Sequence, residues 1–107
     1  MPDTSTAAPP LLVAATRGQR EIVATLLGAG ANPSASDASG RTALLAAACV
    51  GDADTVGALL HAGAAVNAAA RDGLTALGCA ASRGHAAIVD KLLRSGADGA
   101  ARTRDGD

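Results

Sequence analysis

The chain has 107 residues, a formal net charge of −1 and no Phe, Tyr or Trp. The near-neutral charge argues against nucleic acid or an anionic membrane as a partner. No apolar run reaches the roughly 18 residues of a membrane span, and the N-terminal stretch lacks the basic start and the apolar length of a secretory signal. We therefore expect one intracellular, cytoplasmic domain, whose small side chains suit stacked units better than one globular core.

The first predicted elements follow a polar leader over residues 1–8, which we expect to be disordered. Two consecutive prolines then suit the first turn of a helix. We predict this helix over residues 11–17 and an antiparallel partner over residues 19–27. The link over residues 31–40 is rich in Ser, Asp, Pro and Gly, so we expect a protruding turn there.

The next helix is predicted over residues 43–49. Thr42 is a good N-cap for it, because a threonine hydroxyl can accept a hydrogen bond from a free backbone N–H of the first turn. Gly51 breaks the helix and can take the left-handed conformation that a tight turn between two helices needs.

A second helix follows at once. Asp52 and Asp54 are placed in its first turn, where the helix macrodipole favours negative charge. Gly63 is placed to end it. Between them, apolar residues at i, i+3 and i+4 predict one buried stripe, formed by Val56, Leu59 and Leu60.

This unit returns after 33 residues, because Gly40 and Thr42 recur as Gly73 and Thr75. The apolar positions recur in both directions along the chain. The set Leu44, Val56, Leu59 and Leu60 returns as Leu77, Val89, Leu92 and Leu93, and it is preceded by Leu11, Val23, Leu26 and Leu27. A fixed period that keeps leucines and glycines in register indicates a stacked repeat array.

The pattern resembles the ankyrin repeat, a β-turn and two antiparallel helices over about 33 residues. The family's Gly-x-Thr-Pro-Leu-His opening is matched at residues 40–45 and 73–78, without its proline and histidine. Its Ile-Val-x-x-Leu-Leu core is matched at residues 22–27, 55–60 and 88–93. Its Gly-Ala ending is matched at residues 30–31, 63–64 and 96–97.

The resemblance implies an all-α solenoid of stacked helix-turn-helix units joined by β-turn loops. We expect one repeat domain over residues 9–107. Its repeats would cover about 9–36, 37–69 and 70–102, with residues 103–107 as the start of a fourth repeat or a tail. His85 occupies the family's Gly-His position and is expected to stabilise a turn.

The chain carries few signals of chemistry. It has no phosphate-binding loop motif and no His-Glu-x-x-His motif, and neither His61 nor His85 has ligand partners at metal-binding spacing. We therefore predict no catalytic residue, no metal site and no cofactor, and we do not expect an enzyme.

Cys49 and Cys79 are the two cysteines, and they fall on the first helices of neighbouring repeats. A disulfide needs Cα atoms within about 7 Å. Helix axes lie about 8–10 Å apart, and the two positions are not equivalent within the repeat, which argues against such a bond. We expect two half-buried free thiols.

The family resemblance implies a function in recognition. Ankyrin repeats contact partners through a concave face, at positions beside the turn glycine and near the helix ends. In this chain the partner-binding candidates are Arg17, Ser39, Arg41, Val50, Arg71, Asp72, Leu74, Ser82 and Arg83. Further positions of the same kind are Thr16, Ala29, Ala38, Cys49, Ala62 and Ser95.

Four of these candidates are arginine and Asp72 is the only acid, so a mildly basic face would suit an acidic segment of another protein. Four solvated arginines without a shared role are the alternative. We predict a monomeric, non-catalytic protein–protein interaction module. Two other functions remain open. The chain could be a structural spacer within a longer repeat array, or an inhibitor or effector that blocks a partner enzyme.

Overall fold

The computed structural model describes residues 8–96 of the chain. Over this range six helices follow one another as three antiparallel pairs. They are α1 (Pro10–Thr16), α2 (Arg20–Gly28), α3 (Ala43–Val50), α4 (Ala53–His61), α5 (Ala76–Ser82) and α6 (Ala86–Arg94). Within residues 8–96 there is no strand, only two isolated bridges at the bases of two loops. The predicted all-α repeat fold is confirmed.

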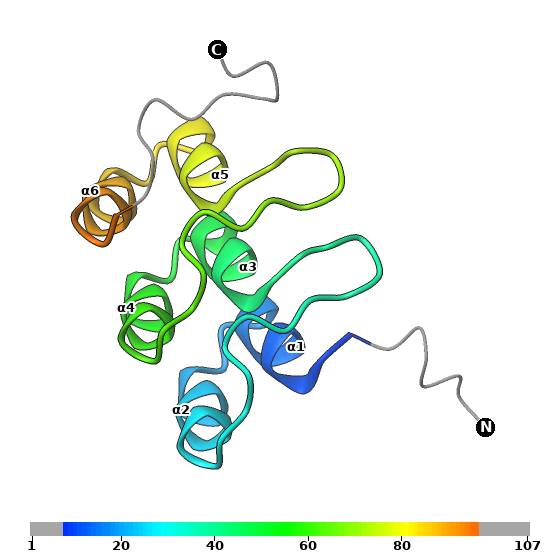
Figure 1. Cartoon of the computed structure of the whole chain (residues 1–107). Helices are drawn as coiled ribbons and strands as arrows, with labels where there is room; N and C mark the ends of the chain where they lie inside the picture. The colour runs from blue at the N-terminus through cyan, green and yellow to red at the C-terminus, as the bar shows by residue number, and fades with distance from the viewer. Residues whose placement is uncertain (1–7, 97–107) are drawn as a thin grey trace.

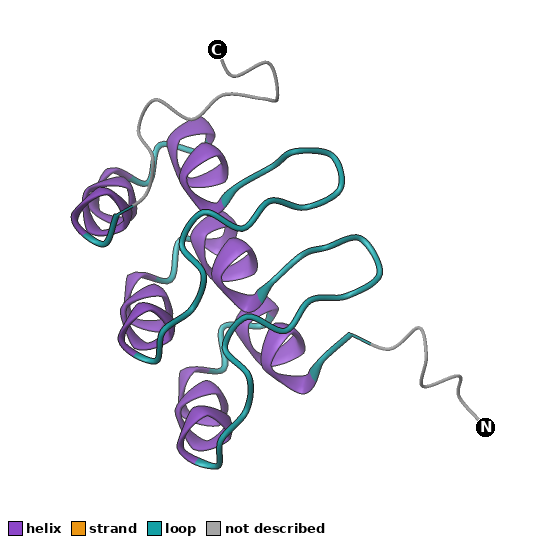
Figure 2. Ribbon diagram, in the orientation of Figure 1, coloured by secondary structure: helices purple, strands orange, loops and turns teal. Residues whose placement is uncertain are grey.

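The helices form two layers. Figure 1 shows α1, α3 and α5 stacked in one row and α2, α4 and α6 in a second row beside it. The two long loops, over residues 29–42 and 62–75, project on the same side of the stack (Figure 2). None of the helices in residues 8–96 is long and apolar enough to cross a bilayer. The leader and the start of a fourth repeat lie outside the described residues, apart from Ala8.

Threonines begin the first helices of the second and third pairs. The backbone N–H of Leu45 donates to Thr42 Oγ1 at 3.2 Å, and that of Gly78 donates to Thr75 Oγ1 at 3.0 Å. The first pair has no such cap, and α1 begins instead with Pro10. The start of α3 at Ala43 agrees with the prediction, and Thr42 is confirmed as an N-cap.

Asp52 was predicted in the first turn of the second helix. The structure places it just before that turn, as the N-cap of α4. Its carboxylate accepts from the backbone N–H of Thr55 at 3.3 Å and from the Thr55 hydroxyl at 2.7 Å, and it lies 3.1 Å from Arg20 Nε. Burial raises the pKa of Asp52, but the hydrogen bonds from Thr55 and the charge of Arg20 outweigh it, so the pKa lies below its ordinary value.

Gly51 ends α3 with a φ of 92°, as predicted. The imidazole of His85, in the next repeat, packs directly against it: a Cβ on Gly51 would lie 2.8 Å from His85 Cε1. His85 Nε2 also lies 3.3 Å from the carbonyl oxygen of Cys49. The His85 side chain makes no capping hydrogen bond to its own helix, and its ring instead joins the third helix pair to the second.

The core lies between the two rows and is built from the repeated apolar positions. Its largest fully buried side chains are Val23, Leu44, Val56, Leu59, Ile88 and Leu92. Each side chain of this size contributes about 1.5–3 kcal/mol when removed from water. Between neighbouring repeats the buried side chains are mostly alanine, including Ala47, Ala48 and Ala80, which are fully buried. These small residues let α1, α3 and α5 pack closely.

The expectation of two free thiols is wrong. Cys49 and Cys79 form a disulfide that links α3 to α5, with Cα atoms 5.3 Å apart. The distance between two helix axes is not the distance between Cα atoms on the facing sides of the helices. Each Cα lies about 2.3 Å from its axis, so two Cα atoms that face each other come nearly 5 Å closer than the axes. The positions also need not be equivalent, because residues three apart share one helix face.

Candidate functional site

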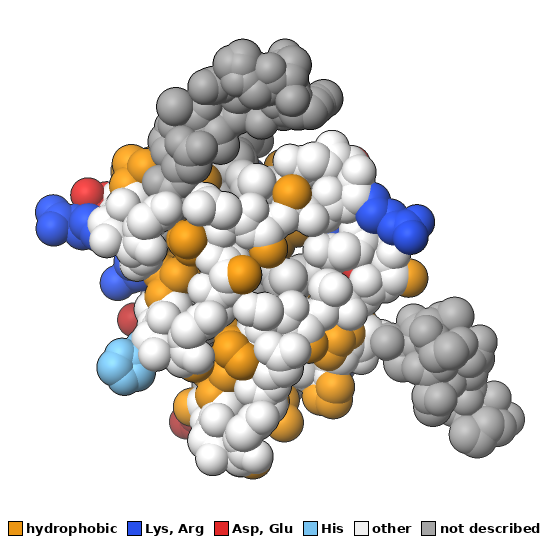
Figure 3. Space-filling view, viewed as in Figure 1, with side chains coloured by type: hydrophobic (Ala, Val, Ile, Leu, Met, Phe, Trp, Pro, Cys, Tyr) orange, Lys and Arg blue, Asp and Glu red, His pale blue; other side chains and the backbone are white. Residues whose placement is uncertain are grey.

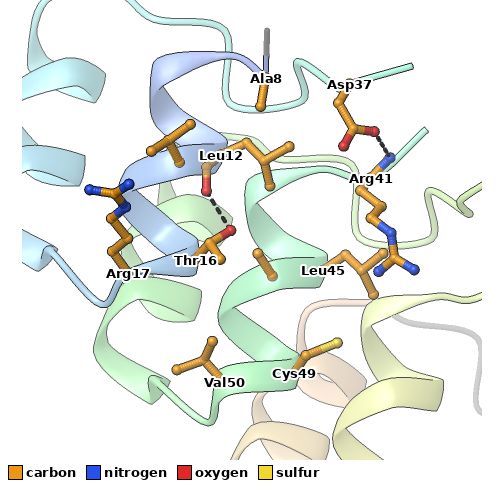
Figure 4. Close-up of a pocket in the computed structure, with 11 residues that line it drawn as sticks. Ala8, Leu12, Thr16, Arg17, Asp37, Arg41, Leu45, Cys49 and Val50 are labelled. Carbon is orange, nitrogen blue, oxygen red and sulfur yellow. Dashed lines mark hydrogen bonds between the residues drawn. The ribbon is translucent and has the colours of Figure 1, made fainter. Parts of the chain in front are cut away.

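A hollow of the described chain lies between α1 and α3, on the side where the long loops project. Its volume is about 390 Å³. We call the surface formed by α1, α3, α5 and these loops the inner face; it corresponds to the concave face of the sequence analysis. The hollow is lined by Ala8, Leu12, Val13, Thr16, Arg17, Asp37, Arg41, Leu45, Ala46, Cys49 and Val50 (Figure 4).

The lining is mainly apolar. Leu12 and Leu45 are buried beneath it, whereas Val13 and Val50 are 37% and 50% exposed. Four large hydrophobic side chains are exposed within residues 8–96, and these two valines line the same hollow. The other two, Ile22 and Leu93, lie on α2 and α6. A small protein that leaves paired valines in water around a hollow has a surface suited to contact with another molecule.

Two arginines border this apolar lining. In Figure 4, Arg17 from the end of α1 and Arg41 from the loop before α3 lie on opposite sides of the hollow. Arg17 forms no ion pair with any residue from 8 to 96. Arg41 Nη2 lies 3.8 Å from Asp72 Oδ2, and both side chains are exposed, so this pair contributes little.

Asp37, the acidic residue that lines the hollow, is held by hydrogen bonds within its own loop. Asp37 Oδ1 accepts from the backbone N–H of Ser39 at 2.8 Å and from that of Arg41 at 3.0 Å. The Thr16 hydroxyl donates to the carbonyl oxygen of Leu12 at 2.8 Å, so its oxygen keeps the capacity to accept a hydrogen bond. The hollow therefore offers an apolar floor, two cations and a hydroxyl acceptor.

A smaller hollow of about 170 Å³ lies between the two long loops. It is lined by Ser39, Arg41, Ala70, Arg71 and Asp72. The backbone N–H of Arg71 donates to the carbonyl oxygen of Ser39 at 2.8 Å and fixes one loop against the other. Arg41 lines both hollows, so the two adjoin each other at its side chain.

The structure thus brings six of the nine candidates to the two hollows. Arg17, Arg41 and Val50 line the larger one, and Ser39, Arg41, Arg71 and Asp72 line the smaller one. Leu74 instead packs beside the disulfide, in a small apolar cluster with Leu45, Ala70 and Cys79. Ser82 and Arg83 are exposed at the end of α5 and line neither hollow.

Sequence reasoning missed the apolar lining, namely Leu12, Val13, Leu45 and Ala46, together with Asp37. The signal was present in the helix spacing. The lining positions of α1 are 12, 13, 16 and 17, and those of α3 are 45, 46, 49 and 50, which is the same helix face one repeat later. A search for apolar residues at these positions of the two first helices would have found Leu12, Val13, Leu45 and Ala46.

Charge is sparse on the side of the molecule shown in Figure 3. Hydrophobic side chains show between the helix pairs, and Lys and Arg lie at its edges. In the part of the chain from 8 to 96, no three His, Cys, Asp or Glu side chains are grouped to hold a metal ion. Nor does any buried side-chain nitrogen or oxygen there lack a hydrogen-bond partner.

A comparison with protein families gives a match along most of the chain. The family model described as Ankyrin repeats (3 copies) matches residues 11–103. No curated protein matches the chain. Ankyrin repeats are in general protein–protein interaction modules rather than enzymes. With three in-phase copies in the sequence, three stacked helix pairs in the structure and a family match over this length, the chain belongs to the ankyrin-repeat family.

Proposed function

We propose that this chain is a non-catalytic protein-binding module whose partner docks on the inner face, in the hollow between α1 and α3. The observation that carries the proposal is the pair of exposed valines, Val13 and Val50, around a hollow floored by Leu12 and Leu45. Binding sites on proteins commonly combine such an apolar centre with a polar rim.

The charges of the rim indicate the chemistry of the partner. Arg17 is without an ion pair among residues 8–96, and the pair of Arg41 with Asp72 is long and exposed. A guanidinium recognises a carboxylate through two parallel hydrogen bonds. We infer that the partner supplies a short segment with apolar side chains for the floor and acidic side chains for Arg17 and Arg41.

The affinity should be modest and sensitive to salt. The chain has no Trp or Tyr to act as an anchor, so arginine is the residue type on this face that most often dominates binding energy. Exposed charge pairs weaken as salt rises, because the Debye length falls to about 8 Å at physiological ionic strength.

The test is a capture experiment with three forms of the protein. The first is wild type, and the second is Arg17→Glu/Arg41→Glu, which reverses the rim charges. The third is Lys91→Glu/Arg94→Glu, which makes the same change of net charge on α6, in the other row of helices. Circular dichroism melts check that all three are folded.

We expect a partner that binds wild type and the α6 variant but not the rim variant. The captured partner should then bind through a segment rich in acidic and apolar residues, mapped with synthetic peptides. Identical capture by all three forms, or equal loss from both variants, would contradict docking at this hollow. The spacer function would then be the better explanation.

A further inference from the structure

The two cysteines of the disulfide between α3 and α5 differ in their exposure on the inner face. Cys49 is partly exposed and lines the larger hollow, whereas Cys79 is only 4% exposed. Cys79 is packed with Leu45 and Ala70, and Cys49 and Leu74 lie against the same cluster. Of the two cysteines, Cys49 is therefore the one that a molecule in the hollow can contact, whereas apolar side chains cover Cys79.

We propose that this disulfide is a thiol–disulfide exchange site, which a dithiol reductant opens in the folded protein by attack on the sulfur of Cys49. This exchange needs no partner protein on the inner face. It concerns a covalent step at two residues that no motif of the repeat requires, because Cys79 aligns with Ala46 and Cys49 with Ser82.

The arrangement of the helices gives the direction of attack. The hollow lies on the α1 side of α3, and α5 packs on the other side of α3 (Figure 1). A thiolate that comes from the hollow therefore meets Cys49 with Cys79 behind it. Exchange proceeds through a mixed disulfide on the attacked sulfur while the other sulfur leaves. Here Cys49 carries the adduct and Cys79 is the leaving group.

The surroundings of Cys79 favour a dithiol over a monothiol. The released sulfur carries the electron pair of the broken bond, and it does so among apolar side chains that solvate a charge poorly. The helix backbones also hold Cys79 beside Cys49, so it attacks the adduct again and expels a monothiol. A dithiol avoids this return, because its second thiol displaces Cys49 and closes a disulfide within the reductant.

The overall reaction is balanced. The bond between Cys49 Sγ and Cys79 Sγ breaks, and a new disulfide forms within the reductant. The reductant loses two electrons and two protons, and the two cysteines gain them as thiols. No metal or further oxidant is required.

The experiment follows the site of first attack. The folded, oxidised protein is treated with glutathione, trapped directly with excess N-ethylmaleimide and digested with trypsin. Cleavage after Arg41, Arg71 and Arg83 separates the two cysteines, since residues 42–71 contain Cys49 and residues 72–83 contain Cys79. We expect the glutathione adduct on the peptide 42–71 and the alkyl group on the peptide 72–83.

A second arm compares reductants. Dithiothreitol should release both thiols while circular dichroism still shows the folded helices, and glutathione at equal thiol concentration should release far fewer. The variant Cys49→Ser/Cys79→Ser is the control and should give no adduct and no response. An adduct mainly on the peptide 72–83 would overturn the proposal. So would two free thiols in the air-oxidised protein, equal action of both reductants, or release only when the protein unfolds.

Discussion

Asp52 shows how one side chain can serve two helices. Its carboxylate caps α4 through Thr55 and also pairs with Arg20 at the start of α2, so a single acid links two neighbouring repeats. This side chain is largely buried, unlike that of Asp54, which Arg20 also contacts at 3.3 Å. The two acids therefore make a matched pair for measuring what the buried contact contributes.

We predict that Asp52→Asn lowers the free energy of unfolding by about 1 kcal/mol at pH 7, the usual scale for weakening a cap and its ion pair. The pKa of Asp52 is lowered in the folded protein, so its contribution is complete above the ordinary carboxyl pKa and is lost as the pH falls through the folded value. Urea titrations from pH 7 down to pH 2 should show the two proteins converging at the acidic end. A difference that persists at pH 2, or an equal loss in Asp54→Asn, would contradict this account.

The sequence predicted some contacts of single residues well and others not at all. The cap at Thr42 and the left-handed turn at Gly51 were predictable, because each depends on the residue's own backbone chemistry. The link from Arg20 to Asp52 and the contact of His85 with Gly51 were not. Periodicity gives a residue its place within a repeat, and it does not say which side chain of the next repeat reaches it.

At the scale of elements, the junctions between helix pairs are not equivalent. Gly51 and Gly63 both end a helix with nearly the same positive φ, 92° and 95°. A Cβ on Gly63 would meet nothing within 4 Å, whereas one on Gly51 would press into the ring of His85. That ring cannot move away freely, because it is held at the carbonyl of Cys49.

We therefore predict different costs for the same substitution. Gly63→Ala should lower the free energy of unfolding by about 1 kcal/mol, which is the cost of a left-handed alanine. Gly51→Ala should cost about 1–2 kcal/mol more, because the new methyl group also displaces His85. Urea denaturation of both variants gives the comparison, and equal losses would mean that the His85 contact does not stabilise the stack.

Helix bounds could be read from the sequence to within about one residue, since prolines, threonines and glycines mark the ends. The separation of the helices could not. The close packing of α3 and α5 depends on which alanines face each other across the repeats, and only the three-dimensional arrangement shows that Cys49 and Cys79 face each other. The disulfide was missed for this reason, although both cysteines had been placed on the correct helices.

For the whole molecule, the sequence predicted the architecture far better than the site. Three copies of one pattern define the stack, and the family's contact positions point to the inner face. They do not indicate where on that face a partner would fit. The larger hollow lies between α1 and α3 with Val13 and Val50 exposed around it, and the repeat motif does not give the depth of the face at this place.

The disulfide should also set much of the molecule's thermal stability. It closes a segment of 30 residues, and a bond of that span restricts the unfolded chain enough to stabilise the fold by several kcal/mol. Dithiothreitol should therefore lower Tm by about 10 °C or more, to the Tm of Cys49→Ser/Cys79→Ser. Calorimetry with and without the reductant checks this, and an unchanged Tm in a fully reduced sample would contradict it.

The same bond has a mechanical consequence. When a stretching force is applied across residues 8–96, the chain between Cys49 and Cys79 cannot be drawn out while the sulfurs stay joined. About 100 Å of contour length is thereby withheld, at about 3.4 Å per residue. Reduction would release that length, so the oxidation state of two sulfur atoms determines how far this solenoid can be extended under tension.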